Sequence, residues 1–231
     1  GAEYRPAADL PASIEASLKA LRTDTLDVFY LHGIAPDMYA EVLDRYLPGL
    51  IAARDAGKIR HIGITERYPR DHDHRMLRQA IQHGAFDVVM VGYNLLSPAA
   101  VTTVLPLAAE YNVGVVVMCA VRSVLVDPDA VADFVRQWQQ EGLLAPDSVD
   151  PSAALDWLLD HQTPDVATAA YKFAAAPPQV GSVLTGTASL HHFDSNLHAV
   201  LGSPLPAEKF QKVLDLFGPV QRNVEPARVG G

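Results

Sequence analysis

The 231-residue sequence predicts an α/β fold built around a parallel β-sheet. Short, nearly continuous apolar runs alternate with longer amphipathic stretches of helical spacing, and a polar residue often follows the end of an apolar run. Alternation of this kind is typical of parallel strands that are buried on both faces and joined by right-handed helical crossovers. We find no short repeat, low-complexity linker or domain boundary, so we predict a single domain over residues 1–231.

The predicted elements follow in order from the N-terminus. Apolar residues at Ile14, Leu18 and Leu21 recur at helical spacing and predict a first helix. The apolar runs predict five strands, at residues 26–31, 59–64, 87–91, 114–119 and 182–184. Apolar stripes predict further helices at residues 38–56, 74–82, 97–111, 189–200 and 207–217. A closed α/β barrel needs eight strands, so these patterns alone leave two alternatives, a partial barrel and an open doubly wound sheet.

Capping signals predict where several helices begin and end. Gly57 and Gly84 are expected to end the helices that precede them. A polar residue followed by proline predicts a helix start, because proline suits the first helical turn. This pair occurs at Ser97-Pro98, Asp127-Pro128, Asp150-Pro151 and Thr163-Pro164.

Composition excludes several classes of function. With 49% hydrophobic residues, the chain can bury a sizeable core. The formal net charge of −9 argues against a general nucleic-acid binder, because phosphate contact needs a basic face. Cys119 is the single cysteine, which excludes an internal disulfide framework and predicts a reducing, cytoplasmic location. No apolar run approaches the roughly 20 residues of a membrane span and no signal peptide is recognisable, so we expect no membrane partner.

The most specific segment is the predicted helix and strand that end on one imidazole, His32. The sequence motif of this segment is Ser17-Leu18-x-x-Leu21-x-Thr23-Asp24-x-Leu26-Asp27-x-x-x-Leu31-His32. Three further motifs follow in order, at Gly57-Lys58-Ile59-Arg60-His61-Ile62-Gly63-Ile64-Thr65, Tyr93-Asn94-Leu95-Leu96, and Val183-Leu184-Thr185-Gly186-Thr187-Ala188-Ser189 with Asn196 beyond it. This ordered set, spanning residues from about 10 to 200, closely resembles the aldo-keto reductases.

The resemblance implies a fold, an activity and a cofactor. The fold would be the (β/α)8 TIM barrel of aldo-keto reductase type, with only about five of its eight strands evident in this chain. The activity would be that of an NAD(P)H-dependent oxidoreductase acting on a small carbonyl, aldose or alcohol substrate. NADP is the cofactor that the family usually uses, and NAD is the alternative. The site would lie at the C-terminal ends of the strands.

The resemblance also implies roles for individual residues. His32 would orient and polarise the substrate carbonyl. Thr65 and Glu66 stand where relatives usually have Ser-Asn, the pair that binds the nicotinamide carboxamide. Cys119 and Arg122 fall in the loop that surrounds the pyrophosphate. The cofactor-phosphate loop and the start of the last barrel helix would contribute Gly186, Thr187, Ser189 and Asn196.

Each of these residues also has a simpler interpretation. His32 could cap its strand by bonding to nearby backbone, and Cys119 could be structural. Glu66 could pair with Arg67 or Arg60 at an exposed rim, where ion pairs contribute little. Arg122 could be a surface ion-pair partner. Met90 stands where many relatives have a carboxamide-binding glutamine, and packing is the favoured interpretation.

The run Asp71-His72-Asp73-His74 raises the question of a metal ion. Four adjacent residues in a turn rarely converge on one ion, so we predict no metal site. A solvated helix start capped by Asp71 or Asp73 is the favoured interpretation.

The same resemblance implies that part of the family's barrel is absent from this chain. The first three βα units of the family, with the catalytic aspartate, tyrosine and lysine, have no counterpart in this chain. We therefore expect the chain alone to be inactive, with an oligomer or a second chain completing the barrel. The alternative is a catalytically incomplete fragment or a non-catalytic, barrel-derived binding or scaffold protein.

Overall fold

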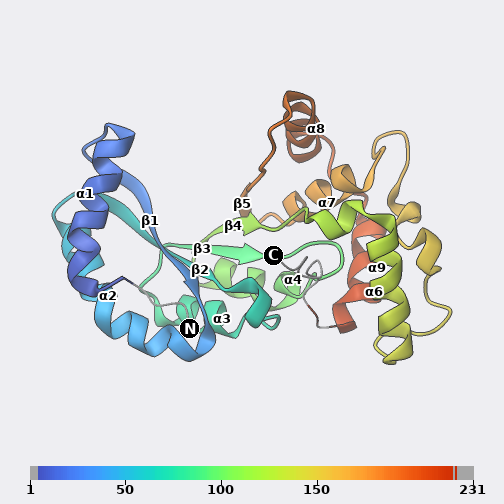
Figure 1. Ribbon diagram of the computed structural model, residues 1–231, viewed down its shortest axis with the longest axis horizontal. Helices are drawn as coiled ribbons and strands as arrows, with labels where there is room; N and C mark the ends of the chain where they lie inside the picture. The colour runs from blue at the N-terminus through green and yellow to red at the C-terminus, as the bar shows by residue number, and fades with distance from the viewer. Residues whose placement is uncertain (1–4, 221, 223–231) are drawn as a thin grey trace, which may run out of the picture.

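The computed structural model describes residues 5–220 and 222. Five parallel strands form one sheet that runs across the middle of the molecule (Figure 1). The strands are β1 (Leu26–Ile34), β2 (Ile59–Glu66), β3 (Val88–Gly92), β4 (Gly114–Met118) and β5 (Val180–Val183). The helices are α1 (Leu10–Leu21), α2 (Tyr39–Asp55), α3 (Arg75–His83), α4 (Ala100–Thr103), α5 (Leu105–Glu110), α6 (Pro128–Gln140), α7 (Val166–Ala175), α8 (Leu190–Leu201) and α9 (Ala207–Phe217).

The strand order distinguishes between the two folds that periodicity left open. Each strand pairs with the next one in sequence, giving the order β1-β2-β3-β4-β5 without reversal. A doubly wound sheet reverses its order at a switch point, whereas a barrel adds each new strand on the same side. The sheet is therefore part of a singly wound barrel, which confirms the predicted α/β class and its five strands.

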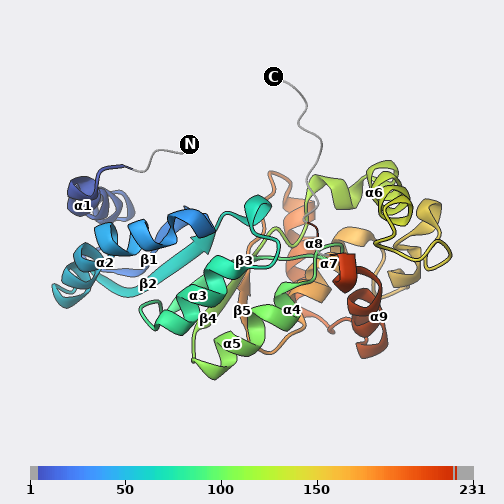
Figure 2. The ribbon, with the colours of Figure 1, turned by 90° about the horizontal axis from the view of Figure 1, so that it is seen from below.

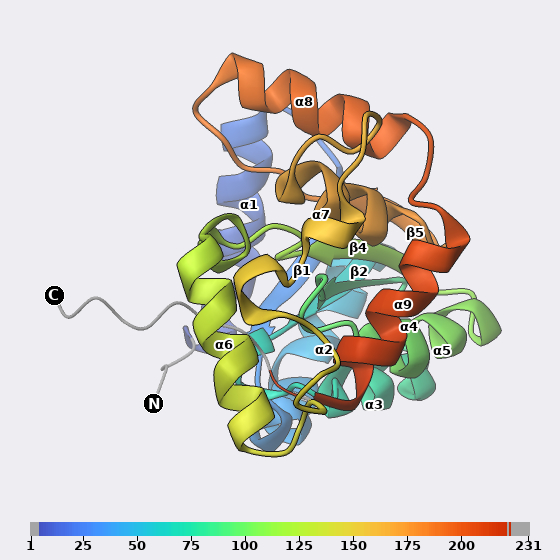
Figure 3. The same cartoon turned by 90° about the vertical axis from the view of Figure 1, so that its right-hand side faces the viewer.

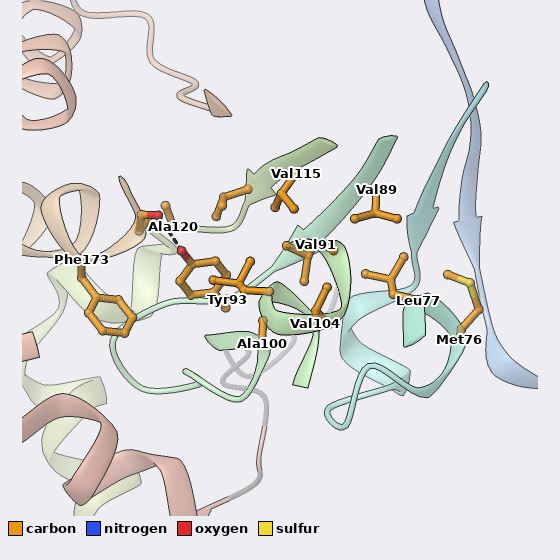
Figure 4. Close-up of a cluster of buried hydrophobic side chains, with 14 of the residues drawn as sticks. Met76, Leu77, Val89, Val91, Tyr93, Ala100, Val104, Val115, Ala120 and Phe173 are labelled. Carbon is orange, nitrogen blue, oxygen red and sulfur yellow. Dashed lines mark hydrogen bonds between the residues drawn. The ribbon is translucent and has the colours of Figure 1, made fainter. Parts of the chain in front are cut away.

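One face of the sheet packs against the hydrophobic core. Val89, Val91, Val115 and Val117 alternate along β3 and β4 and are almost completely buried. They pack with Leu77 of α3 and with Val104, as the close-up shows (Figure 4). Figure 2 shows α2, α3 and α5 along this face, and all three contact the strands.

The opposite face of the sheet is more open. Val88, Met90, Val116 and Met118 occupy the alternate positions of β3 and β4 and are only half-buried. Within the described part of the chain, β1 and β5 are the edges of the sheet. Beyond β5, α8 packs beside α7 and away from the sheet (Figure 3). Its exposed side carries an apolar stripe of Leu190, Phe193, Leu197 and Leu201.

Several predicted helix boundaries are wrong. Ser97-Pro98 does not begin a helix, because α4 starts at Ala100 with Ala99 as its N-cap. The helix predicted over residues 97–111 divides into α4 and α5, because Pro106 in the first turn of α5 cannot donate a hydrogen bond to the preceding turn. Thr163-Pro164 does not open a helix: Asp165 is the N-cap of α7 and its side chain accepts from the Thr168 N–H. Asp150-Pro151 does begin a helix, and the Asp150 side chain accepts from the Ser152 N–H as a cap, but this is the short 3₁₀ helix Pro151–Ala153.

Other capping predictions are confirmed. The side chain of Asp127 accepts hydrogen bonds from the first turn of α6. Gly84 adopts a left-handed conformation at the end of α3, as predicted. At the start of α8, the structure adds a cap that was not predicted, Ser189.

Candidate active site

The C-terminal ends of β1 and β2 bring His32 and Thr65 together. The regular register, with Leu31 opposite Ile64, shifts before Ile34. Gly33 lies in this irregularity with φ of +70°, a conformation that glycine adopts without steric cost. Its N–H donates to Thr65 Oγ1 at 2.7 Å. The bulge therefore brings the backbone N–H of Gly33 in β1 into contact with the side chain of Thr65 in the neighbouring strand, β2.

His32 is bound through the same hydroxyl. Its Nδ1 lies 3.0 Å from Thr65 Oγ1. Thr65 is 1% exposed, whereas His32 is exposed. Among the described residues, the ring of His32 makes this bond to a side chain and none to a backbone atom, so the structure does not support the strand-cap interpretation. A buried hydroxyl holds one ring nitrogen, and the rest of the imidazole faces solvent.

A cavity of about 200 Å³ opens beside His32. Its wall includes Phe29, Tyr30 and Tyr46, and it lies between β1, α2 and the residues before α1. Tyr30 also covers Gly63, where an added Cβ would clash with the tyrosine ring. Burial raises the pKa of Tyr30, so its phenol stays protonated well into the alkaline range. The wall is therefore mostly apolar, and the imidazole shares it with the polar side chains of Arg5, Asp9 and Ser13.

Glu66 does not lie at an exposed rim. Its carboxylate oxygens are 2.8 Å and 3.0 Å from His74 Nδ1, and Oε1 also accepts from the Gly92 N–H at 2.8 Å. Burial raises the pKa of Glu66, while His74 and the Gly92 N–H act to lower it. The expected pairing with Arg67 or Arg60 is wrong: Arg60 pairs with Asp27. The Glu66 carboxylate is thus occupied inside the protein.

His74 is a site residue that the sequence interpretation missed. It was assigned to a solvated helix start, yet its side chain is 1% exposed and its φ of +53° places it in the left-handed region. Tyr68 stacks on its ring, with centroids 6.3 Å apart. No local signal separates the buried His74 from the half-buried His72, because the burial of His74 depends on its contact with Glu66.

Asn94 links the ends of three strands. Its amide nitrogen donates to Tyr68 Oη at 3.4 Å and to the Cys119 carbonyl at 3.3 Å. Burial raises the pKa of Tyr68, so this phenol remains neutral. The motif containing Asn94 was recognised, but its role as a connector was not.

Cys119 and Arg122 lie directly after β4. Cys119 has a φ of +62° and is half-buried, and Arg122 Nη1 lies 3.4 Å from its Sγ. On the open face, Met90 is opposite Thr65 in the register of β2 and β3. Its thioether is half-buried and offers no strong hydrogen-bond donor at that position.

The remaining predicted residues form a second group at the start of α8. Thr187 Oγ1 accepts from the Ser189 N–H, and Ser189 Oγ accepts from the His192 N–H. Asn196 donates to Thr185 Oγ1 at 2.7 Å and so ties α8 to the preceding loop. An added Cβ at Gly186 would meet no atom within 4 Å, so its surroundings are open.

Two backbone donors remain available at this helix start. Among the described residues, the N–H groups of Leu190 and His191 have no hydrogen-bond partner. Free N–H groups and the positive end of the helix dipole favour an anion such as a phosphate. No described contact joins this group to His32 or Thr65.

The described residues contain no group of three or more His, Cys, Asp or Glu side chains able to hold a metal ion. In the run from residue 71 to 74, Asp71 accepts from the Met76 N–H at the start of α3, as predicted for a cap. Asp71 is buried, however, so the predicted solvated helix start is wrong. None of the helices in the described ranges combines the length and apolarity that crossing a membrane requires.

Comparison with known proteins adds a family. The model described as "Aldo/keto reductase family" matches residues 3–216. The "Uncharacterized oxidoreductase YqkF" of Bacillus subtilis (strain 168) is 21% identical over 201 residues, covering 86% of this chain and 62% of that protein. The "NADH-specific methylglyoxal reductase" of Escherichia coli (strain K12) is 26% identical over 122 residues, covering 53% of this chain and 36% of that protein. The chain thus spans less than two thirds of these curated relatives.

Solved structures agree on the fold. The apo form of aldo-keto reductase AKR11C1 from Bacillus halodurans superposes with a TM-score of 0.64 at 20% identity, covering 96% of this chain and 71% of that one. Its holo form gives a TM-score of 0.63 at 21% identity, covering 97% and 70%. At this identity the similarity concerns the arrangement of the backbone.

Proposed function

Because this chain belongs to the aldo/keto reductase family, we propose that it serves an NAD(P)H-dependent reduction of a small aldehyde, ketone or sugar carbonyl. The observation that carries the proposal is His32, exposed at the C-terminal end of β1 and bound through Nδ1 to the buried Thr65 hydroxyl. An imidazole so oriented presents its other nitrogen to a ligand in the adjoining cavity. The mostly apolar wall of that cavity suits the carbon skeleton of such a substrate.

The residues at the start of α8 fit the phosphate end of a dinucleotide. The free N–H groups of Leu190 and His191, the open surroundings of Gly186 and the cap formed by Ser189 are what an anion needs at a helix N-terminus. Arg122, at the loop after β4, would add a charged donor. NADP is the proposed cofactor because the family usually uses it. NAD is the alternative, because His191 and His192 stand here in place of a lysine or arginine that would hold a second phosphate.

The nicotinamide carboxamide would not be held by the Ser-Asn pair and the glutamine that relatives use. The Thr65 hydroxyl is already bound to the Gly33 N–H and to His32 Nδ1, and Glu66 is engaged by His74 and Gly92. Met90 cannot replace the hydrogen bonds of an amide side chain. When bound, the nicotinamide supplies the hydride; His32 contributes a hydrogen bond to the carbonyl oxygen as negative charge develops on it.

The proposal extends to the assembly. The open sheet edges at β1 and β5 and the half-buried face between them are surfaces that a parallel barrel normally covers. We therefore propose that further polypeptide, in an oligomer or a second chain, covers them and completes the site with a proton donor. A cytoplasmic location accords with the single cysteine.

A fluorescence titration of this chain with NADPH and, in parallel, NADH tests the proposal. We expect saturable binding of at least one of them, and the tighter one identifies the cofactor. Binding of neither would contradict the proposal and favour a non-catalytic scaffold. The readout does not require turnover by the chain alone.

The phosphate position has its own test. Leu190 is the first residue of α8, and Ser189 before it has the extended conformation that proline requires of its predecessor. Leu190→Pro therefore removes one N–H while keeping the helix start. We expect it to weaken dinucleotide binding, whereas Leu190→Ala, which keeps the N–H, leaves binding unchanged. Equal affinities would show that this N–H does not contact the phosphate.

A further inference from the structure

The Thr65 hydroxyl has a defined hydrogen-bond inventory. It can donate one proton and accept two bonds. The Gly33 N–H, 2.7 Å away, has only a proton to offer, so the oxygen accepts there. The other polar neighbour that the described residues place on this hydroxyl is His32 Nδ1, at 3.0 Å.

The donors and acceptors available to the Thr65 hydroxyl decide which atom donates in its hydrogen bond with His32 Nδ1. If Nδ1 carried a proton, the hydroxyl would accept from both neighbours and its own proton would be buried without an acceptor. Thr65 is 1% exposed, so solvent does not offer one readily. An unsatisfied buried donor costs free energy, whereas donation to an unprotonated Nδ1 satisfies every group.

We propose that Thr65 is a positioning residue that holds neutral His32 in the tautomer protonated on Nε2. The consequence for catalysis rests on the proposed function: Nε2–H is then the group presented to the substrate. That group donates, so the ligand atom it selects is an acceptor, as a carbonyl oxygen is. The tautomer itself follows from the contacts of the unliganded chain.

A second consequence concerns the cofactor. With its proton committed to His32, the Thr65 hydroxyl has none left to donate to a carboxamide oxygen. One lone pair remains, so it can only accept, for example from a carboxamide NH₂. Thr65 therefore acts first on the imidazole of His32, and its contact with a ligand is limited to this one direction.

Nitrogen NMR of the full chain with ¹⁵N-labelled histidine tests the proposal directly. Two-bond proton–nitrogen correlations distinguish a protonated ring nitrogen from an unprotonated one, and His32→Gln assigns the signals of His32 by their loss. At a pH where His32 is neutral, we expect Nε2 in the protonated range and Nδ1 in the unprotonated range. The reverse pattern in the unmodified chain overturns the proposal.

Variants test whether Thr65 causes the preference. Thr65→Val keeps the shape without the hydroxyl, and we expect both His32 nitrogens to move toward the average of the two tautomers. Thr65→Ser should restore the original shifts. Thr103→Val, which removes a hydroxyl from α4, is the matched control and should leave them unchanged. Unchanged His32 shifts in Thr65→Val would overturn the proposal.

The readout needs neither cofactor nor substrate, so it is separate from the proposed function. A chain that shows the Nε2–H tautomer but binds neither NADPH nor NADH would support the role of Thr65 and contradict the reductase. A chain that binds the cofactor but carries its proton on Nδ1 would do the opposite.

Discussion

His74 Nδ1 lies 2.8 Å and 3.0 Å from the two carboxylate oxygens of Glu66, and both side chains are almost completely excluded from solvent. Glu66 ends β2, and its Oε1 also accepts from the N–H of Gly92 at the end of β3. The pair therefore connects two strand ends with the turn that opens α3. It lies one residue from Thr65, so the position of the His32 partner depends on it.

Removing the carboxylate should destabilise the fold strongly. Glu66→Leu leaves His74 and the Gly92 N–H without their partner in the interior, and breaking a buried pair in this way costs about 3–5 kcal/mol. We expect that loss in the free energy of unfolding measured by urea denaturation. Asp133→Leu, which breaks the exposed pair with Arg136, should cost no more than about 1 kcal/mol. Similar losses in the two variants would contradict the importance of burial.

The hydroxyl of Tyr39 has no hydrogen-bond partner among the described residues, although it is buried. Tyr39→Phe removes this unsatisfied group, and we expect the free energy of unfolding to rise by about 1 kcal/mol at neutral pH. Tyr111→Phe, at an exposed position, should change it by less than about 0.5 kcal/mol. A clear loss of stability in Tyr39→Phe would mean that the hydroxyl has a partner.

The same residue predicts a pH dependence. Burial raises the pKa of Tyr39 from 10.0 to about 12. Since the pKa is higher in the folded state, the unfolded state loses the phenol proton first, so the free energy of unfolding is unaffected below pH 10 and falls between pH 10 and about pH 12. Urea denaturation across this window should therefore show a shallower decline for Tyr39→Phe than for the unmodified chain. Parallel declines would contradict the raised pKa.

The ring of Tyr68 packs against Gly92, in the space that a side chain at this position would need. A Cβ at this position would lie 2.5 Å from Tyr68 Cδ2, and Tyr68 is too deeply buried to move aside. We expect Gly92→Ala to destabilise the fold by about 1–3 kcal/mol. The control is Gly114→Ala, where the nearest atom is at an ordinary 3.5 Å and the effect should be neutral or slightly stabilising. Thermal unfolding of both variants decides, and equal midpoints would refute the steric explanation.

Acid stability should respond to Asp160. Its hydrogen bonds with Lys209 and with the Gln162 N–H lower its pKa from 3.8 to about 2. Because the pKa is lower in the folded state, the stabilisation is present above pH 3.8 and is lost as the pH falls toward 2. Asp160→Asn should flatten the stability profile in that window, measured by circular dichroism during acid titration. Lys209→Met should also flatten the stability profile. An unchanged profile in both variants would show that the Asp160–Lys209 pair does not contribute to acid stability.

Much of the fold follows from local patterns. Nearly continuous apolar runs placed strands where β1 to β4 lie, and β5 begins two residues before its predicted start. The cap formed by Asp127 and the glycine end of α3 were recognisable because capping depends on one residue and its own helix turn. The break at Pro106 was overlooked, although the proline itself was visible.

The candidate site divides in the same way. That His32 and Thr65 both follow apolar runs was evident, and parallel strands bring such ends to one edge of a sheet. Their contact was not evident, because it depends on the bulge at Gly33 and on the register between β1 and β2. The buried role of Glu66 was misjudged, since its partner His74 belongs to a run of polar residues that looks solvated.

The sequence by itself determined the class of fold, the number and approximate position of the strands, and the family resemblance. These properties depend on periodicity, capping and motif order, which are local. Only the tertiary structure decided the strand order, the pairing of Glu66 with His74 and the donor and acceptor roles of Thr65. Burial and hydrogen-bond satisfaction are properties of groups that meet from distant parts of the chain, so no local pattern records them.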